Sequence, residues 1–280
     1  MKPAWSAQFD AGELGTTQAL PVDGPITRDW AIGGATGAGV KVAVVDSGID
    51  ASHPAVGAVQ GGVVVGLNER GEVQVVEGEH EDLFGHGTAC AGIIRGIAPE
   101  CELYSVRVLG SRLSGKGQVF AAGLRWAIEN GMQVVNLSLG TGKRDHFAEL
   151  HDLADEAYFR QTMLVSAVNN VPVPSYPSQY SSVFSVAAHD RTDPFHFDYN
   201  PSPPVEFGAP GIDIEVAWMR GSTIRATGNS FAAAHVSGMV ALLLSRHPGL
   251  TPFHVKTVLH ALADNAAPAG RAAVASSGRP

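Results

Sequence analysis

The sequence predicts an α/β fold, a three-layer α/β/α architecture with a mostly parallel central sheet. Segments with strand and helix patterns alternate along most of the chain, which favours a sheet between two layers of helices. One segment, 40–45, is a short and mostly apolar run rich in valine, typical of a central strand buried on both faces. A chain of 280 residues that is 45% hydrophobic can bury the core of one such domain.

The first part of the chain contains an arm, a short helix and a hairpin. Residues 1–25 lack periodicity and end in turn-forming residues, so we expect an N-terminal arm ahead of one domain over 26–263. A short helix over 26–32 precedes the valine-rich strand. Alternation over 61–76 indicates a hairpin, and we expect the acidic stretch 77–82 to be a solvated surface loop.

The rest of the domain continues the alternation of strands and helices. Strands are expected over 103–108, 134–139, 163–168 and 183–188, and helices over 115–130, 147–160 and from Ser230 onward. A last helix over 252–262 has Thr251 at its N-cap and Pro252 in its first turn, as helix starts favour. Residues 264–280 are rich in Ala, Gly, Ser and Pro, which predicts a flexible C-terminal tail.

Composition indicates which classes of partner and which cellular compartment to expect. The formal net charge is −8 and the isoelectric point about 5.7, so no basic face for nucleic acid is expected. The longest apolar run, 239–244, is too short to cross a bilayer, so we expect no membrane partner. The N-terminus lacks the apolar core of a secretion signal, and the two cysteines, Cys90 and Cys101, form no disulfide framework. We therefore expect free thiols and a cytoplasmic protein.

Three polar residues stand where strands end or helices begin. Asp46 follows the valine-rich strand, His86 lies between two glycines before a small-residue helix, and Ser230 opens another such helix. Taken singly, Asp46 can cap a turn, His86 can be an ordinary core or surface histidine, and Ser230 can be an N-cap. Taken together, they are the parts of a nucleophilic site, in which a base takes the hydroxyl proton and a carboxylate orients the base.

Four motifs carry a family resemblance. They are Val-Val-Asp-Ser-Gly-Ile at 44–49, Gly-His-Gly-Thr at 85–88, Asn-Leu-Ser-Leu-Gly at 136–140 and Gly-Asn-Ser-Phe-Ala-Ala at 228–233. These motifs resemble the signatures of the subtilase family, in that family's Asp…His…Ser order, and the resemblance covers about 26–262. It implies a subtilisin-like fold and a serine endopeptidase acting on an extended polypeptide or a precursor peptide. Ser230 would then be the nucleophile, His86 the general base and Asp46 its orienting carboxylate.

The resemblance also implies an oxyanion donor and substrate walls. The family places an asparagine donor at the end of a strand. Aligning the strand over 163–168 selects Asn170, and a shift by one residue selects Asn169. The residues that would contact substrate are Ser114, Gly115, Ser138, Leu139, Gly140 and Ser175. Ser175 makes the primary specificity pocket neutral, and Gly117, where many relatives carry an aromatic wall, leaves a more distant subsite wide.

Two departures from the family pattern lie beside the nucleophile. Asn229 replaces the usual threonine, and we hypothesise that its amide donates toward the oxyanion. Ala234 replaces a usual proline, and the room this leaves beside Ser230 keeps transpeptidation or macrocyclisation as an alternative activity. A third alternative, from another class, is a binding protein on a catalytically dead scaffold of this fold.

The family's tight calcium site has no counterpart in the sequence. Its loop would interrupt the helix after the histidine, before the next strand. Here that helix is expected to run over 88–94 and to meet Arg95-Gly96 without an Asn/Asp-rich insertion, and Arg95 repels a cation. We therefore expect no tight calcium site, no metal ligands and no cofactor.

Overall fold

A computed structural model describes residues 6–9, 20, 22, 24–202 and 204–266 of the chain. Most of the predicted arm over 1–25, and positions 267–280 of the predicted tail, lie outside these residues. The start of that tail is tied to the domain, because Asp264 accepts hydrogen bonds from Arg28 Nη2 (2.7 Å) and from Phe197 N (3.0 Å). The contacts of the domain therefore continue past the predicted boundary at residue 263.

The centre of the molecule is a nine-stranded sheet with the order β3-β2-β4-β1-β5-β6-β7-β9-β8. Its neighbouring strands run parallel, except for the β2–β3 pair at one edge and the β8–β9 pair at the other. The strands are β1 (Lys41–Asp46), β2 (Gly61–Leu67), β3 (Val73–Glu77), β4 (Glu102–Arg107), β5 (Val134–Leu137), β6 (Met163–Ala167), β7 (Phe184–His189), β8 (Asp198–Tyr199) and β9 (Phe207–Pro210). The predicted mostly parallel central sheet is confirmed.

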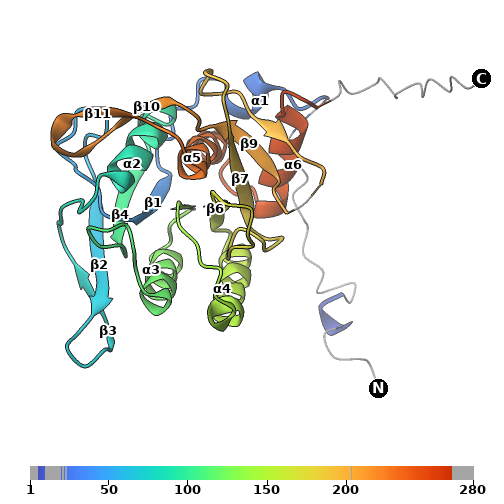
Figure 1. The fold of residues 1–280 in the computed structure, drawn as a ribbon. Coiled ribbons are helices and arrows are strands. Elements are labelled where there is room, and N and C mark those ends of the chain that lie inside the picture. Colours follow the sequence, from blue (N-terminus) through green and yellow to red (C-terminus); the bar gives the residue numbers. More distant parts are fainter. Residues whose placement is uncertain (1–5, 10–19, 21, 23, 203, 267–280) are drawn as a thin grey trace, which may run out of the picture.

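Helices cover both faces of the sheet, which makes the three predicted layers (Figure 1). One face carries α3 (Gly117–Glu129) and α4 (Phe147–Phe159), and the other carries α1 (Arg28–Ile32), α2 (His86–Ile97), α5 (Asn229–Arg246) and α6 (Pro252–Leu262). Alternate residues of β1 serve the two cores: Val45 packs in the core under α3, and Val44 in the core under α5. Burial on both faces explains why this strand is apolar throughout.

The most deeply buried helix is α5, in which every residue from Ser230 to Leu244 is buried. Its small residues let α2 approach closely, since a Cβ on Gly238 would lie 2.8 Å from Ile97 Cβ. The rings of His86 and Phe231, near the starts of the two helices, have centroids 5.7 Å apart. The starts of α2 and α5 therefore lie side by side, next to the carboxyl end of β1.

Several helices and strands begin or end at the residues predicted from the sequence, and several short elements were not predicted. The capping of α6 is as expected, with Thr251 Oγ1 accepting from His254 N and Pro252 in the first turn. The short strands β8, β9, β10 (Ile214–Ala217) and β11 (Thr223–Ala226) lie between β7 and α5, with the 3₁₀ turn Met219–Gly221 between the last two. Two further 3₁₀ turns, Ser6–Phe9 and Arg144–His146, lie earlier in the chain. The expected end of α2 at Ile94 is wrong, because the helix continues to Ile97.

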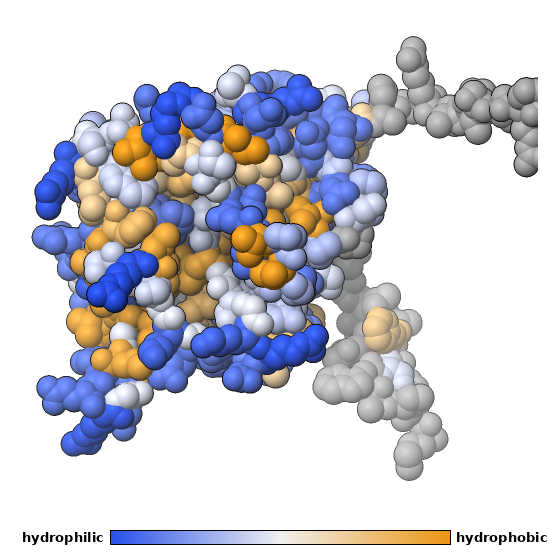
Figure 2. All heavy atoms as spheres, viewed as in Figure 1, coloured by the Kyte–Doolittle hydropathy of each residue, from blue (hydrophilic) through white to orange (hydrophobic). Residues whose placement is uncertain are grey.

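The predicted hairpin is confirmed as β2 and β3, at an edge of the sheet. Figure 2 shows hydrophobic side chains on this edge, and the exposed ones are Leu67, Val73, Val75 and Val76. All five residues of β3 are exposed. In the described part of the chain, no helix has the length and hydropathy that a membrane crossing requires.

Candidate active site

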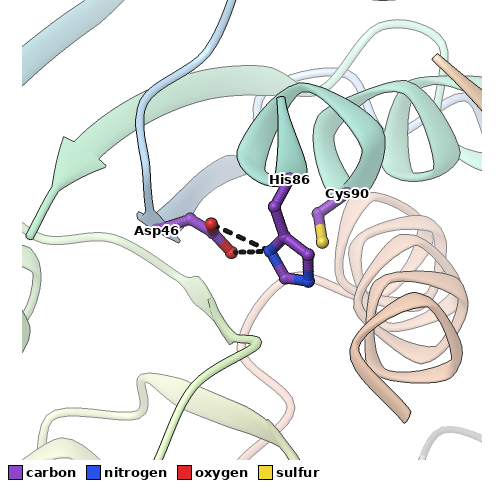
Figure 3. Close-up of side chains that lie close together, drawn as sticks. All are labelled: Asp46, His86 and Cys90. Atoms are coloured by element: carbon purple, nitrogen blue, oxygen red, sulfur yellow. Dashed lines mark hydrogen bonds and ion pairs between the residues drawn. The ribbon is translucent and has the colours of Figure 1, made fainter. Parts of the chain in front are cut away.

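The predicted carboxylate and imidazole meet at the carboxyl end of the central strand. β1 ends at Asp46 and α2 begins at His86. Nδ1 of His86 lies 2.8 Å from Asp46 Oδ2 and 2.9 Å from Oδ1, so Nδ1–H donates to the carboxylate (Figure 3). Asp46 is fully buried and His86 is 8% exposed, so water competes little for the pair. With Nδ1 protonated, Nε2 is left as the acceptor of the ring.

Two glycines allow this approach, as the sequence suggested. Gly85 has a φ of 108°, and a Cβ there would lie 2.6 Å from Trp218 Cε2. A Cβ on Gly87 would lie 2.0 Å from the carbonyl oxygen of Gly48. A larger residue at either position would push the start of α2 away from β1 and separate the imidazole from its carboxylate.

A second buried carboxylate, Asp82, holds the start of α2. It accepts five hydrogen bonds of 2.6–2.9 Å, from Ser47 Oγ, Phe84 N, Gly85 N, Thr88 N and Thr88 Oγ1. The prediction that 77–82 is solvated surface is therefore wrong for its last residue, which is 8% exposed. A signal for this role was present in the sequence, because a carboxylate just before a helix start can accept from the unpaired N–H groups there.

Burial and negative charge act in opposite directions on His86. Burial lowers the pKa of His86, but the charge of Asp46 and its hydrogen bond raise that pKa, with a further contribution from the charge of Asp82. The carboxylates prevail, so the pKa of His86 is raised above its ordinary value of 6.5. A base with such a pKa can both take a proton and return it near neutral pH.

The predicted nucleophile lies in the first turn of α5. Its interpretation as an N-cap is wrong, because the N-cap is Gly228 and Ser230 is the second residue of the helix. Ser230 Oγ donates to the carbonyl oxygen of Ser138 (3.2 Å), and among the described residues no hydrogen bond joins it to His86. Both side chains line one cleft. Proton transfer between them requires the hydroxyl to leave Ser138, and catalytic hydrogen bonds commonly tighten only when substrate binds.

A chain of buried polar groups fixes α5 against β5. Ser138 Oγ donates to the carbonyl oxygen of Ser230 (3.1 Å) and accepts from Asn136 Nδ2 (2.9 Å). Asn136 Oδ1 in turn accepts from Ser237 Oγ (3.0 Å). Cys90 Sγ lies 3.3 Å from Ser138 Oγ, and Figure 3 shows it beside the imidazole on the same helix. Burial raises the pKa of this thiol well above its ordinary value, so the thiol stays protonated.

The structure distinguishes the two candidate oxyanion donors. Asn170 Oδ1 accepts from the backbone N–H of Asn229 (3.0 Å), and its NH₂ group has no partner among the described residues. Asn169 Oδ1 instead accepts locally from Val171 N (3.0 Å). Both residues line the cleft. The geometry favours Asn170, because its amide is held against the start of α5 with two donors unused.

The hypothesis that Asn229 donates to an oxyanion is wrong. Its Nδ2 donates to the carbonyl oxygens of Val168 (3.2 Å) and Asn169 (3.1 Å), and its Oδ1 accepts from Ala188 N (2.8 Å). Both amide hydrogens are therefore in use. This side chain fastens the ends of β6 and β7 to the start of α5 and so positions the neighbouring Ser230.

One cleft of about 420 Å³ is lined by the predicted base, nucleophile, oxyanion donor and substrate-binding residues, while the fully buried Asp46 does not line it. Besides His86, Asn170 and Ser230 it is lined by the six predicted wall residues, Ser114, Gly115, Ser138, Leu139, Gly140 and Ser175. The backbone N–H and C=O groups of Gly115 and Gly140 make no hydrogen bond within the described residues. Such groups can pair with an extended chain that adds alongside them as a strand.

The side chains that line the cleft are neutral or positively charged. Ser175 Oγ lies 3.0 Å from Ser178 Oγ, which makes this part of the wall neutral. No aspartate or glutamate occurs among the described residues that line the cleft, whereas Lys116 and Lys143 do. A basic side chain of a substrate would find no carboxylate here.

The expected width of the distant subsite is wrong. A Cβ on Gly117 would lie 2.1 Å from His146 Nε2, so the imidazole of His146 occupies the room that the glycine leaves. Both residues line the cleft. The segment before α4 therefore supplies the aromatic wall that Gly117 cannot.

A larger hollow, of about 1120 Å³, lies elsewhere on the molecule. Its lining includes Glu77, His80 and Asn130 but none of His86, Ser230 or the predicted substrate walls. Size alone would select it as the site. We place the site in the smaller cleft because the hydroxyl and the base converge there.

The residues after His86 do not fit a tight calcium site. α2 is continuous, and the Arg95 guanidinium donates to four carbonyl oxygens at 2.7–2.9 Å, those of Val56, Ala58, Pro99 and Cys101. Calcium needs several free oxygens of this kind. Here they accept from a positive charge that the chain itself supplies.

The chemistry available in this cleft is nucleophilic attack on a carbonyl group. A hydroxyl, a buried base with its orienting carboxylate, and N–H donors at a helix start all converge there. This set of groups can form an acyl-enzyme and stabilise the oxyanion that precedes it.

Comparison with known proteins points to the same family as the sequence motifs, over most of the chain. The model of the Subtilase family matches residues 37–277. The chain is 34% identical over 261 residues to M-protease of Shouchella clausii, covering 87% of this chain and 65% of that relative. It is 34% identical over 250 residues to Subtilisin E of Bacillus subtilis, covering 82% of this chain and 62% of the relative. The chain thus spans about two thirds of the length of these relatives.

A shorter relative and a solved structure match over most of their lengths. Subtilisin Savinase of Lederbergia lenta is 34% identical over 239 residues, which cover 81% of this chain and 84% of the relative. The crystal structure of a cold adapted subtilisin-like serine proteinase superposes with a TM-score of 0.67 at 28% identity, covering 81% of this chain and 82% of that one.

Proposed function

The chain belongs to the subtilase family, and from that premise we propose that it is a serine endopeptidase that hydrolyses peptide bonds in extended polypeptides through an acyl-enzyme. The observation that carries the proposal is the buried Asp46–His86 pair, joined at 2.8 Å, in the same cleft as Ser230. A binding protein on a dead scaffold would have no need of a buried imidazole hydrogen-bonded to a carboxylate beside a serine that lines the same cleft.

Acylation begins when the Ser230 hydroxyl leaves the carbonyl oxygen of Ser138 and turns toward His86. As Oγ attacks the peptide carbonyl carbon, its proton passes to Nε2 of His86, and the carbonyl π electrons move onto oxygen. Asp46 holds the ring in the tautomer that accepts at Nε2 and stabilises the imidazolium. When the C–N bond breaks, the imidazolium gives its proton to the leaving amine, and the acyl group stays on Ser230.

Deacylation repeats the same steps with water as the nucleophile. His86 takes a proton from the attacking water and then returns it to Ser230 Oγ as the ester bond breaks. The acid product and the free hydroxyl are thereby restored.

Two donors face the negative oxygen in both halves of the reaction. The NH₂ group of Asn170 is one, and its amide is held in place by the backbone N–H of Asn229. The backbone N–H of Ser230, among the first in α5, has no partner within its own helix and supplies the other.

Hydrolysis is favoured over transfer to an amine. Transpeptidation would draw on extra room beside Ser230 at Ala234, but that residue is fully buried in the core and does not line the cleft. The cleft charges support cleavage after neutral, apolar residues rather than after lysine or arginine.

A peptide library with products identified by mass tests the proposal. We expect hydrolytic products cut after neutral residues, and none from Ser230→Ala. A general endopeptidase would cut many members, whereas a dedicated precursor-processing enzyme would cut few, at one shared pattern. Equal cleavage by Ser230→Ala would refute the mechanism, and head-to-tail products would establish ligation in its place.

We also propose a cytoplasmic location. Both cysteines, Cys90 and Cys101, are buried free thiols, which suits a reducing compartment. Cell fractionation with an antibody against the chain checks this, and recovery from the culture medium would contradict it.

A further inference from the structure

A cluster of two histidines and an aspartate lies around the end of β7, outside the catalytic cleft. His189 ends β7, His196 lies in the following loop, and Asp198 begins β8. β7 and β8 flank β9, and the residue of β9 opposite Asp198 is Gly208. A Cβ on Gly208 would lie 3.5 Å from the His189 ring and 3.9 Å from Asp198 Cβ, so this glycine separates the two side chains without filling the space between them.

Two ring nitrogens in the cluster have no hydrogen-bond partner. Nε2 of His189 and Nε2 of His196 are both buried, and they are the two such side-chain atoms among the described residues. The two rings contact each other edge to face, with centroids 5.2 Å apart. Buried polar atoms without a hydrogen bond are rare in folded proteins, and an ion or ordered water is a common reason for them.

The spacing of the cluster suits a small metal ion. One ligand atom from each of His189, His196 and Asp198 can be chosen so that all three lie within 4.8 Å of one another. His196 Nε2 lies 3.5 Å from Asp198 Oδ2. Two ligands at the zinc–nitrogen and zinc–oxygen distances of about 2.1 Å, in tetrahedral arrangement, are separated by roughly 3.4 Å.

A second carboxylate orients one of the histidines. Asp264 Oδ2 lies 3.3 Å from His196 Nδ1, and Asp264 is itself fixed by Arg28 and by the backbone N–H of Phe197. A proton held on Nδ1 by this carboxylate leaves the lone pair of Nε2 for a metal. Histidines that bind metals commonly give their other N–H to a carboxylate in this way.

We propose that His189, His196 and Asp198 bind one divalent transition-metal ion, with Zn²⁺ the best match and water in the fourth position. Two imidazoles and one carboxylate form a donor set that suits zinc, whereas calcium and magnesium prefer sets made only of oxygen. This proposal departs from the sequence expectation of no metal ligands, which was argued from the helix after His86.

Metal binding at His189 has a cost. Nδ1 of His189 lies 3.2 Å from the backbone N of Arg191, which donates to it. Coordination through Nε2 moves the ring proton to Nδ1 and breaks that hydrogen bond. We therefore expect a site weaker than the all-cysteine and all-histidine zinc sites, and one that small local movement completes.

Zinc titration of chelator-treated protein tests the proposal, with calorimetry and the melting temperature as readouts. A Ser230→Ala, His86→Ala background removes the catalytic imidazole as a competing ligand. We expect one Zn²⁺ per chain, a higher melting temperature with Zn²⁺ and no such rise with Mg²⁺. His189→Ala and His196→Ala should abolish binding, and Asp264→Asn should weaken it about 10- to 100-fold. His151→Ala, which removes an exposed histidine paired with Asp155, is the matched control and should bind as the background does.

Cobalt gives a readout that does not depend on the stability of any variant. Bound Co²⁺ with tetrahedral ligands absorbs strongly in the visible range, and Zn²⁺ should displace that signal. Absence of stoichiometric binding in the folded background would overturn the proposal, and so would binding that His189→Ala and His196→Ala leave unchanged.

Discussion

The two halves of the active site are held by different kinds of contact. In the base half, defined by Asp46, Asp82 and His86, a buried carboxylate accepts five hydrogen bonds at the start of α2. In the nucleophile half, defined by Asn170, Asn229 and Ser230, neutral amides bond to backbone groups at the start of α5. Hydrogen bonds to a charged group are roughly twice as strong as neutral ones.

This difference shows which half is set in advance. His86 already donates to Asp46, whereas Ser230 donates to the Ser138 carbonyl and not to the imidazole. The base half is therefore ready before substrate arrives, and the nucleophile half completes its geometry when substrate binds. The predictions below test the two halves separately.

The largest effect is expected from removal of the base. His86→Ala leaves no acceptor for the Ser230 proton, so kcat/KM for peptide hydrolysis should fall by several orders of magnitude. Circular dichroism should show an unchanged fold. His151→Ala, at an exposed histidine of α4, should keep wild-type activity. A fall of less than tenfold in His86→Ala would show that another group acts as the base.

The second-largest loss of activity is expected from a substitution in the nucleophile half. Asn170→Ala removes an oxyanion donor and should lower kcat about 100- to 1000-fold with little change in KM. Asn169→Ala, at its exposed neighbour, should lower kcat far less, because within the described residues that side chain bonds only to the nearby Val171 N. Steady-state kinetics of both variants decide the assignment, and the reverse order of effects would select Asn169 as the donor.

Substitution of Asp82, which holds the start of α2 in the base half, should cause a smaller loss of activity and a measurable loss of stability. Asp82→Asn points an NH₂ group at the N–H and O–H of Thr88, which now donate to Oδ2. We expect unfolding in urea to lose about 3 kcal/mol of free energy, and activity to fall moderately as the start of α2 loosens. Glu81→Gln is the matched control, since that neighbouring side chain is exposed. Equal stability of the two variants would contradict an anchoring role.

The smallest effect is a shift in the pH profile. The base must be neutral to act, so kcat/KM should rise as pH passes the pKa of His86, with a midpoint above 6.5 because the nearby carboxylates raise that pKa. Asp82→Asn removes the smallest of the charges responsible and should move the midpoint slightly downward. A wild-type midpoint below 6.5 would show that burial prevails over the carboxylates.

Local signals made most of the fold predictable. The valine-rich run before Asp46 and the capped helix over 252–262 can each be recognised from a few neighbouring residues, and both occur as expected. The strands β8 to β11 were not predicted, because each has two to four residues and pairs with a partner that no local pattern identifies. Contacts across the fold, not local preference, form such short strands.

The active-site residues were predictable where a motif surrounds them and not where tertiary contacts decide. Asp46, His86 and Ser230 each stand in a recognisable motif, and the structure brings them to one end of the sheet. The role of Asn229 depends on its partner Ala188, whose position the sequence does not reveal. The role of Asp82 had a local signal, because this carboxylate comes just before the start of α2 and bonds to Thr88 there. His189 and Asp198 meet only through β9, which was itself not predicted.

Labelling with a fluorophosphonate probe tests the central claim most directly, since the probe reacts with a serine that a neighbouring base activates. The account predicts one adduct per chain, located on Ser230 by peptide mass mapping, and formed orders of magnitude more slowly in His86→Ala. An adduct on another residue, or equal rates in wild type and His86→Ala, would contradict an Asp46–His86 pair that activates Ser230.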